Sequence, residues 1–136
     1  PKDKMDRIID YVDLFLFDLK HMIAEDHIEH TGVSNKLILE NLKYLTEKGK
    51  TIIIRFPMIP GFNDSEENIN MMLDFLNQLP KKPDFHILPY HRTGQDKFRR
   101  FGIENNMPDI PSLMEEDTKW VQAIFRESGY KVSVGG

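Results

Sequence analysis

The chain has 136 residues, of which 40% are hydrophobic and 29% are charged, and its net charge at neutral pH is −4. These values predict one globular domain and speak against extended disorder and against a nucleic-acid-binding surface. No apolar run reaches the roughly 18 residues of a membrane span, and the sequence opens without a signal-peptide pattern, so we expect a cytoplasmic protein.

Cysteine is absent from the sequence. This excludes disulfides, thiolate nucleophiles and cysteine-ligated zinc or iron–sulfur centres within these residues. The chain also opens on Pro1, in what the pattern predicts to be the tail of a helix over Met5 to Ile9. We therefore expect a chain cropped from a longer protein, with processing as the alternative.

The first strand is predicted over Asp13 to Leu19, because a short run rich in aromatic and branched residues is typical of a parallel strand buried on both faces. Alternation divides its side chains between two faces. One face carries Leu14, Leu16, Asp18 and Lys20, and the other carries Phe15 and Phe17. An acid and a base thus project together from the carboxyl end of the strand, where ligands bind in α/β folds.

The next segment is predicted to be short and helical or irregular over Met22 to His30, with a turn at Thr31-Gly32. A helix then begins after Ser34 as the expected N-cap and ends before Gly49. Its expected buried stripe consists of Leu37, Ile38, Leu42 and Leu45.

The second strand is predicted over Thr51 to Met58, with pairing that fades near Pro57 because proline cannot donate to a sheet ladder. A turn at residues 61–64 leads to a helix opened by Ser65 together with Asn68. The expected buried stripe of this helix consists of Ile69, Met72, Leu73, Leu76 and Leu79.

A third strand is predicted from Asp84 to Leu88 or slightly beyond, followed by a short helix over Thr93 to Phe101 and a loop over residues 105–111. A last helix, capped by Ser112 and ending near Glu127, is expected before a brief strand over residues 131–134. Its apolar positions are Leu113, Trp120, Val121, Ile124 and Phe125. The alternating order predicts an α/β fold with parallel strands joined by crossover helices.

Polar side chains are expected where these strands end: Asp18, Lys20, Arg55 and His91. Such an edge suits a small zwitterion, whose ammonium would meet Asp18 and whose carboxylate would meet Lys20 or Arg55. The alternatives are a solvated strand end, a structural pair between Arg55 and Asp64 or a glutamate, and an exposed His91. His86 and His91 do not have the spacing of a metal-binding pair.

Four motifs in order resemble those of glycyl-radical-enzyme activating enzymes, of which the pyruvate formate-lyase activating enzyme is the best-known kind. The motifs are Asp-Leu-Phe-Leu-Phe-Asp-Leu-Lys-His-Met from residue 13, Thr-Gly-Val-Ser-Asn from residue 31, Arg-Phe-Pro-Met-Ile-Pro-Gly-Phe-Asn-Asp from residue 55, and Leu-Pro-Tyr-His-Arg-Thr-Gly from residue 88. The resemblance covers residues 9–136 and implies the C-terminal half of a partial (β/α)6 TIM-like barrel of the radical S-adenosylmethionine superfamily.

In that family a [4Fe-4S] cluster reduces S-adenosylmethionine, and the resulting 5'-deoxyadenosyl radical removes a hydrogen from a glycine of the partner enzyme. The resemblance therefore implies these cofactors, a glycyl radical enzyme as partner, and flavodoxin or ferredoxin as electron donor for the parent protein. The family's three cluster cysteines and its Gly-Gly-Glu segment are missing from this chain. We expect the chain alone to be inactive and to bind S-adenosylmethionine weakly.

The resemblance also assigns roles to single positions. Asp18 matches the acid near the methionyl ammonium and a monovalent cation, Lys20 the base of the same motif, and Leu19 a backbone contact between them. Pro57 matches a residue that lines the nucleoside by its backbone, and His91 a histidine that contacts the nucleoside. Arg55 matches an arginine that faces the partner's glycine loop.

Two other functions stay open on the sequence alone. One is a stand-alone domain that binds an anionic metabolite or a protein partner at the strand ends. The other is a cofactor-independent barrel enzyme that uses Lys20 as a Schiff-base or general-base lysine. If the chain is half a barrel, its first strand is an uncovered edge, and we expect a homo-oligomer that buries Leu14 and Leu16.

Overall fold

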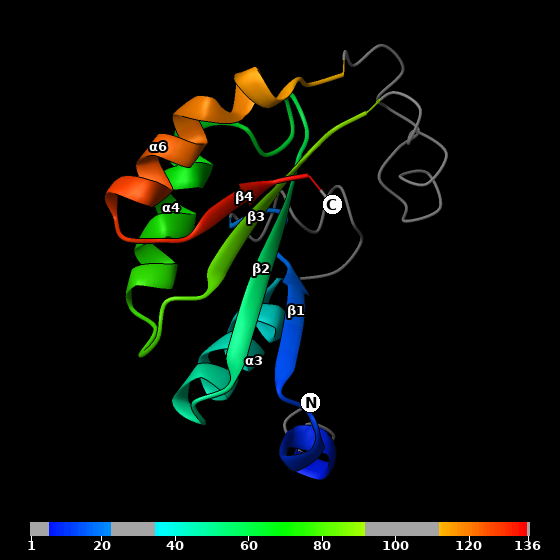
Figure 1. Cartoon of the computed structure of the whole chain (residues 1–136), viewed down its shortest axis with the longest axis vertical. Helices are drawn as coiled ribbons and strands as arrows, with labels where there is room; N and C mark the ends of the chain where they lie inside the picture. Colours follow the sequence, from blue (N-terminus) through cyan, green and yellow to red (C-terminus); the bar gives the residue numbers. More distant parts are fainter. Residues whose placement is uncertain (1–5, 23–34, 92–111, 136) are drawn as a thin grey trace.

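The computed structural model describes residues 6–22, 35–91 and 112–135 (Figure 1). The strands are β1 (Leu14–Asp18), β2 (Thr51–Met58), β3 (Asp84–Pro89) and β4 (Val132–Val134). The helices are α3 (Lys36–Glu47), α4 (Glu66–Asn77) and α6 (Lys119–Glu127), with 3-10 turns η1 (Ile9–Tyr11) and η3 (Glu115–Thr118).

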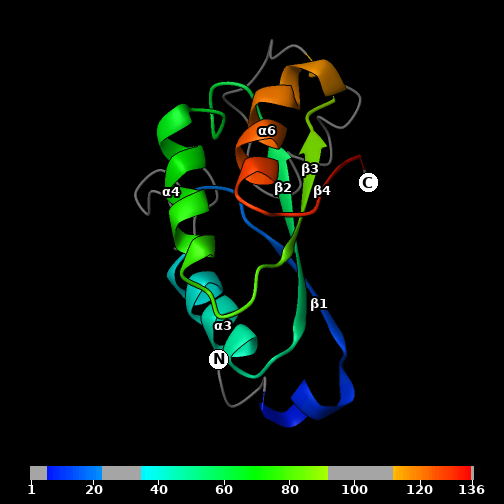
Figure 2. The same ribbon diagram turned by 60° about the vertical axis from the view of Figure 1, so that its left-hand side comes forward.

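The four strands form one parallel sheet in the order β1-β2-β3-β4. Each strand therefore lies beside the one that precedes it in the chain, which is the winding of a barrel segment rather than of a doubly wound sheet. Figure 2 shows the helices running alongside the strands. The predicted α/β fold with a parallel sheet is confirmed.

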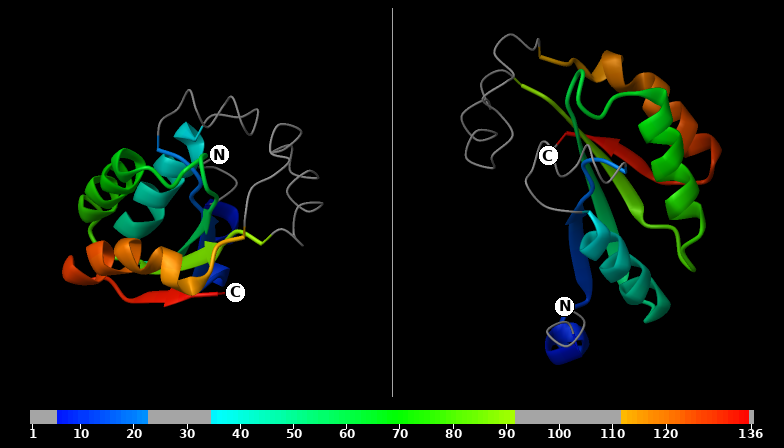
Figure 3. Two further views of the ribbon diagram at one scale, coloured as in Figure 1. Left: turned by 90° about the horizontal axis from the view of Figure 1, so that it is seen from above. Right: turned by 180° about the vertical axis from the view of Figure 1, so that it is seen from behind.

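The hydrophobic core lies on one face of this sheet, where α3, α4 and α6 pack (Figure 3). Alternate residues of the two central strands point into it, among them Ile54, Phe56 and Phe85. The ring of Phe85 stacks on that of Phe125 from α6, with centroids 3.9 Å apart. Each helix contributes a buried stripe, so the helices and the sheet stabilise one another by removing apolar surface from water.

The opposite face of β1 is open, which corrects the expectation of a strand buried on both faces. Leu14 is 47% exposed and Leu16 is 55% exposed, whereas Phe15 and Phe17 pack against the core. The predicted division of side chains between the two faces is therefore right. Among the described strands, β2 is the neighbour of β1, and the second edge of β1 has no partner strand.

Pairing does not fade at Pro57 as expected, because β2 stays paired with β3 through Met58. The amide of Leu19 donates to the carbonyl of Arg55 on the β1 side, and the amide of Tyr90 donates to the carbonyl of Met58 on the β3 side. Backbone groups alternate between the two sides of a strand, so the missing N–H of Pro57 faces β1. The pairing with β1 has already ended at Arg55, so the ladder loses little.

The helices follow the sequence closely, with corrections to two boundaries and to one buried stripe. The N-cap of α3 is Asn35 rather than Ser34, and Leu37 is 47% exposed while Leu39 packs on the core. The last helical segment begins with η3 after Met114, not after Ser112, because the Asp117 carboxylate accepts a hydrogen bond from the Met114 amide.

Other local predictions are confirmed. Gly49 has a φ of 76°, the left-handed conformation that favours glycine after a helix, and the Ser65 hydroxyl accepts from the Asn68 amide as an N-cap. The predicted segment after residue 22, the turn at Thr31-Gly32, the helix over Thr93 to Phe101 and the loop over residues 105–111 lie outside the described residues. In the described part of the chain, no helix is long and apolar enough to cross a membrane.

Candidate functional site

The carboxyl end of β1 carries an ion pair between Asp18 and Arg55. Arg55 Nε lies 2.7 Å from Asp18 Oδ1, and Arg55 Nη2 lies 3.2 Å from Asp18 Oδ2. The two residues are direct register partners in β1 and β2, so their side chains leave the sheet on the same open face. Each side chain is 42% exposed. The pair is therefore accessible, and it is held in place by the strand register.

The hydrogen bonds from Arg55 to Asp18 raise the pKa of the guanidinium, and the neighbouring negative charge adds to this effect. Arg55 does not pair with Asp64, which was one alternative from the sequence. Asp64 instead accepts a hydrogen bond from the Gly61 amide, 2.9 Å long, and so closes the turn after β2. Asp64 therefore has a structural role in the turn, whereas the Arg55 side chain lies on the open face of the sheet with Asp18.

Leu19 and Lys20 continue the chain beyond the ion pair. The Leu19 side chain is buried, and its amide donates to the carbonyl of Arg55 at 2.9 Å. The amide of Leu19 is thus used within the sheet, which leaves its carbonyl as the group for a backbone contact with a ligand. Lys20 is partly buried directly after it. The structure thus places the predicted Asp-Leu-Lys segment at one end of the open face.

A buried network of asparagines holds this segment in place, and sequence reasoning missed it. Asn68 Oδ1 accepts from the Met22 amide at 2.7 Å, and Asn68 Nδ2 donates to the carbonyl of Asn63 at 2.9 Å. The side chain of Asn63 donates in turn to the carbonyl of Pro57 at 2.6 Å. Two fully buried amides thus join the segment after Lys20 to the turn after β2. The available signal was an asparagine within the apolar stripe of α4.

Pro57 and His91 do not join the ion pair directly. Pro57 is buried, and its carbonyl already accepts the Asn63 amide. His91 is exposed and follows Tyr90, whose amide donates to Met58 and whose carbonyl accepts from Leu113. These bonds fix the backbone beside His91 at the end of β3. Among the described residues, no hydrogen bond links His91 to the ion pair.

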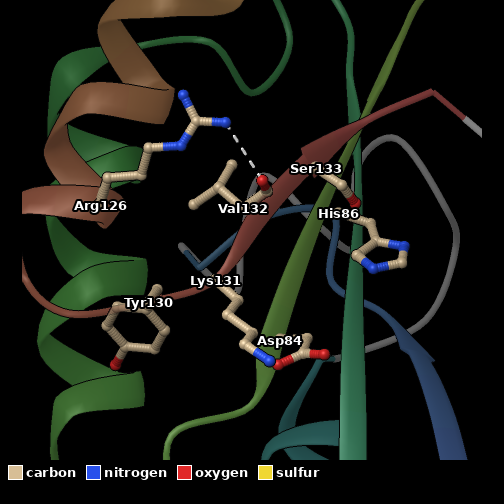
Figure 4. A pocket seen from close by; sticks show the side chains of 7 residues that line it. All are labelled: Asp84, His86, Arg126, Tyr130, Lys131, Val132 and Ser133. Carbon is tan, nitrogen blue, oxygen red and sulfur yellow. Dashed lines mark hydrogen bonds between the residues drawn. The ribbon is translucent and has the colours of Figure 1, made fainter.

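His86, which sequence reasoning set aside, lies on the same face as Arg55 and is its register partner in β3. Together with Ser133 of β4 it lines an open pocket of about 640 Å³ (Figure 4). The other lining residues are Asp84, Arg126, Tyr130, Lys131 and Val132. Strand register, which single-sequence patterns do not give, was needed to place His86 beside the ion pair.

The chemistry of this site fits part of the cofactor set that the sequence resemblance implies. A carboxylate offers about four lone-pair positions, so Asp18 can accept from an ammonium while it holds Arg55. An iron–sulfur cluster does not fit, because the chain has no cysteine. In the described residues, no three His, Asp or Glu side chains gather as a metal site. A cluster would need ligands that lie outside these 136 residues.

A comparison with models of protein families finds no match. The chain is 39% identical over 127 residues to the choline trimethylamine-lyase activating enzyme of Oleidesulfovibrio alaskensis, a match that covers 91% of the chain and 41% of that protein. It is 34% identical over 136 residues to the pyruvate formate-lyase 2-activating enzyme of Escherichia coli, with 100% and 46% covered. The chain thus spans less than half the length of these relatives.

Among solved structures, the chain resembles a domain of the pyruvate-formate lyase-activating enzyme from Bacteroides vulgatus. The TM-score is 0.82 at 30% identity, and the match covers 100% of the chain and 75% of that domain. The order of the motifs, the parallel sheet and these similarities agree. The chain belongs to the glycyl-radical-enzyme activating enzymes, a family of the radical S-adenosylmethionine superfamily with a TIM-like barrel fold.

Proposed function

We propose that the chain is the C-terminal half of a barrel in a larger activating enzyme, which installs a glycyl radical on a partner such as pyruvate formate-lyase. The observation that carries this proposal is the accessible Asp18–Arg55 pair at the strand-end face of a fold that resembles a domain of a pyruvate-formate lyase-activating enzyme. S-adenosylmethionine, when bound beside a reduced [4Fe-4S] cluster, supplies the hydrogen-abstracting group. On this proposal, the residues of this chain bind and orient the cofactor and the partner's glycine loop.

On this proposal the methionyl end of the cofactor lies at the end of β1. Asp18 accepts from the ammonium and contributes an oxygen to a monovalent cation, while Lys20 meets the carboxylate. The carbonyl of Leu19 lies between them. Pro57 and His91 line the nucleoside, since the bonds of Tyr90 hold the end of β3 beside that of β2. Arg55 faces the partner's glycine loop with the N–H groups that Asp18 does not use.

The cluster and the remaining cofactor contacts belong, on this proposal, to a half of the barrel outside these residues. The lack of cysteine and the open face of β1 support this division. The parent would take its electron from flavodoxin or ferredoxin and would work in the cytoplasm. The 136 residues alone would not catalyse the reaction.

The free edge of β1 supplies a consequence for the isolated chain. Because the amide of Leu19 points to β2, alternation directs the backbone groups of Leu14, Leu16 and Asp18 away from it. An edge of this kind, with exposed leucines on one face, pairs readily with another chain. We propose that the isolated chain forms a homo-oligomer there, and that in the parent this edge is covered by the other half.

Two observations test the proposed function. The DNA that encodes the residues upstream of Pro1 should specify cysteines spaced Cys-x3-Cys-x2-Cys, and a start codon directly before Pro1 would contradict the proposal. In calorimetry, S-adenosylmethionine should bind the full-length protein, whereas the 136-residue chain should show a Kd weaker than roughly 10 μM (about −7 kcal/mol). Tight binding to the short chain would show that the missing half is not needed for the site.

A further inference from the structure

A row of polar side chains crosses the open face of the sheet from β1 to β4. Asp18 pairs in register with Arg55, Arg55 with His86, and His86 with Ser133. Direct register partners in a parallel sheet carry their side chains on the same face. All four side chains therefore point away from the helices. We call Asp18, Arg55, His86 and Ser133 the polar rung.

On β2 the polar rung has apolar neighbours on both sides, while on β3 the charged Asp84 precedes His86 on the same face. On the amino-terminal side Leu16 is paired with Ile53, and on the carboxyl-terminal side Pro57 is paired with Leu88. A few polar groups within an apolar surround are typical of a binding site, whereas a solvated face would carry charges throughout. The rung therefore has the composition of a site that contacts a ligand.

The polar rung has unused hydrogen-bonding capacity. A guanidinium has five N–H donors, and Asp18 takes two of those of Arg55. In the described part of the chain, no hydrogen bond to the side chain of His86 or Ser133 is found, and both line the open pocket at the β4 end (Figure 4). An imidazole and a hydroxyl can each donate and accept, which complements the purely donating arginine.

We infer that the glycine-bearing segment of the partner binds along the polar rung, and that His86 and Ser133 bind its main chain beyond Arg55. This inference rests on the proposed function. Neighbouring strands are about 4.8 Å apart, so the rung spans about 14 Å, the length of about four extended residues. Main-chain amides present both N–H and C=O groups, which a rung of donors and acceptors satisfies. A glycine, without a side chain, allows the close approach that such contacts need.

The test uses the full-length protein that contains this chain, with its cluster rebuilt, and offers it choline trimethylamine-lyase and pyruvate formate-lyase in turn. Glycyl radical yield is measured by electron paramagnetic resonance as a function of partner concentration. Cleavage of S-adenosylmethionine without partner is measured in parallel. The variants are His86→Leu, His86→Gln and Ser133→Ala, and Ser128→Ala at the end of α6 is the matched serine control.

We expect His86→Leu to raise the KM for the partner about tenfold and Ser133→Ala about threefold, with partner-free cleavage within twofold of the unaltered protein. His86→Gln should restore most of the affinity, and Ser128→Ala should change nothing. If the unaltered protein makes the radical and neither His86→Leu nor Ser133→Ala changes this KM, the rung inference alone is wrong. If both variants instead weaken partner-free cleavage, the rung serves the small-molecule cofactor and the inference is also wrong. If the unaltered protein makes no radical on either partner, the proposed function fails and the inference fails with it.

Discussion

Arg55 holds both carboxylate oxygens of Asp18, through Nε at 2.7 Å and Nη2 at 3.2 Å. On the proposed roles, Asp18 serves the cofactor and Arg55 serves the partner, so one ion pair joins the two sites. A cation that binds Asp18 shares these carboxylate oxygens with Arg55. Cofactor and partner affinities should then depend on each other, since such coupling is reciprocal.

The ion pair should contribute little to folding. Because each side chain is 42% exposed, solvent screens the pair, and we expect Arg55→Met to lower the free energy of unfolding by less than about 1 kcal/mol. Urea denaturation of the 136-residue chain measures this change. Arg55→Lys should also lower the free energy of unfolding by less than about 1 kcal/mol. Lysine keeps the positive charge, although it cannot bind both carboxylate oxygens of Asp18 at once as arginine does. A loss above about 2 kcal/mol for Arg55→Met would show that the pair is structural.

The buried asparagine network should be far more important for stability. Asn68→Ala removes the acceptor of the Met22 amide and the donor to the Asn63 carbonyl, and it leaves a partly buried amide and a buried carbonyl without these partners. We expect a loss of about 2–3 kcal/mol in the free energy of unfolding. Asn70→Ala, at an exposed position of the same helix, is the matched control and should cost less than about 0.5 kcal/mol. Equal losses for the two variants would refute the network's role.

The corrected stripe of α3 makes a similar comparison possible with leucines. Leu42 is fully buried, whereas Leu37, which the pattern placed in the same stripe, is 47% exposed. Leu42→Ala should cost about 2–5 kcal/mol because it leaves a cavity, and Leu37→Ala should cost less than about 0.5 kcal/mol. Thermal or urea unfolding of both variants decides the point. A large loss at Leu37 in the isolated chain would mean that this surface is buried in an assembly.

Stability should fall at high pH through Tyr130. Burial raises the pKa of its hydroxyl to about 12, from an ordinary value of 10.0, and the hydroxyl donates to Asn77 Oδ1 at 2.8 Å. Because the folded state favours the protonated form, this contribution is complete below pH 10 and is lost as the pH rises towards about 12. We expect a loss on the order of 1 kcal/mol over this interval.

Tyr130→Phe is the control for this pH dependence. The variant lacks the titrating hydroxyl, so its unfolding free energy should lose less between pH 10 and pH 12 than that of the unaltered chain. All other side chains are the same in both proteins, so the comparison isolates the effect of the Tyr130 hydroxyl. Parallel pH profiles for the two proteins would show that Tyr130 does not titrate as described.

The sequence was sufficient for elements whose signals are local. The aliphatic run of β2, the Ser65 cap and Gly49 after α3 all act through a few neighbouring residues, and each was predicted correctly. Leu37 was misplaced because a helical stripe has a width, and tertiary packing decides which residues at its margin are covered. The exposure of Leu16 depends on what lies on the open face, which a strand pattern does not contain.

In the candidate site too, some features follow from local sequence and others depend on long-range pairing. Asp18 and Arg55 could be placed at strand ends from the sequence, but their mutual ion pair depends on the register between β1 and β2. His86 was dismissed because it was considered only as a possible partner of His91 in a metal site. Its place beside Arg55 follows from long-range pairing, and no spacing within one segment reveals it.

The most direct measurement is an electron paramagnetic resonance spectrum of a glycyl radical enzyme after incubation with the full-length protein, S-adenosylmethionine and a reductant. We predict the signal of a glycyl radical on the partner, reduced at least tenfold when Arg55→Met removes the guanidinium that faces the glycine loop. Cleavage of S-adenosylmethionine should persist in that variant. Cleavage by the unaltered protein without a glycyl radical on pyruvate formate-lyase or choline trimethylamine-lyase would contradict the proposed function.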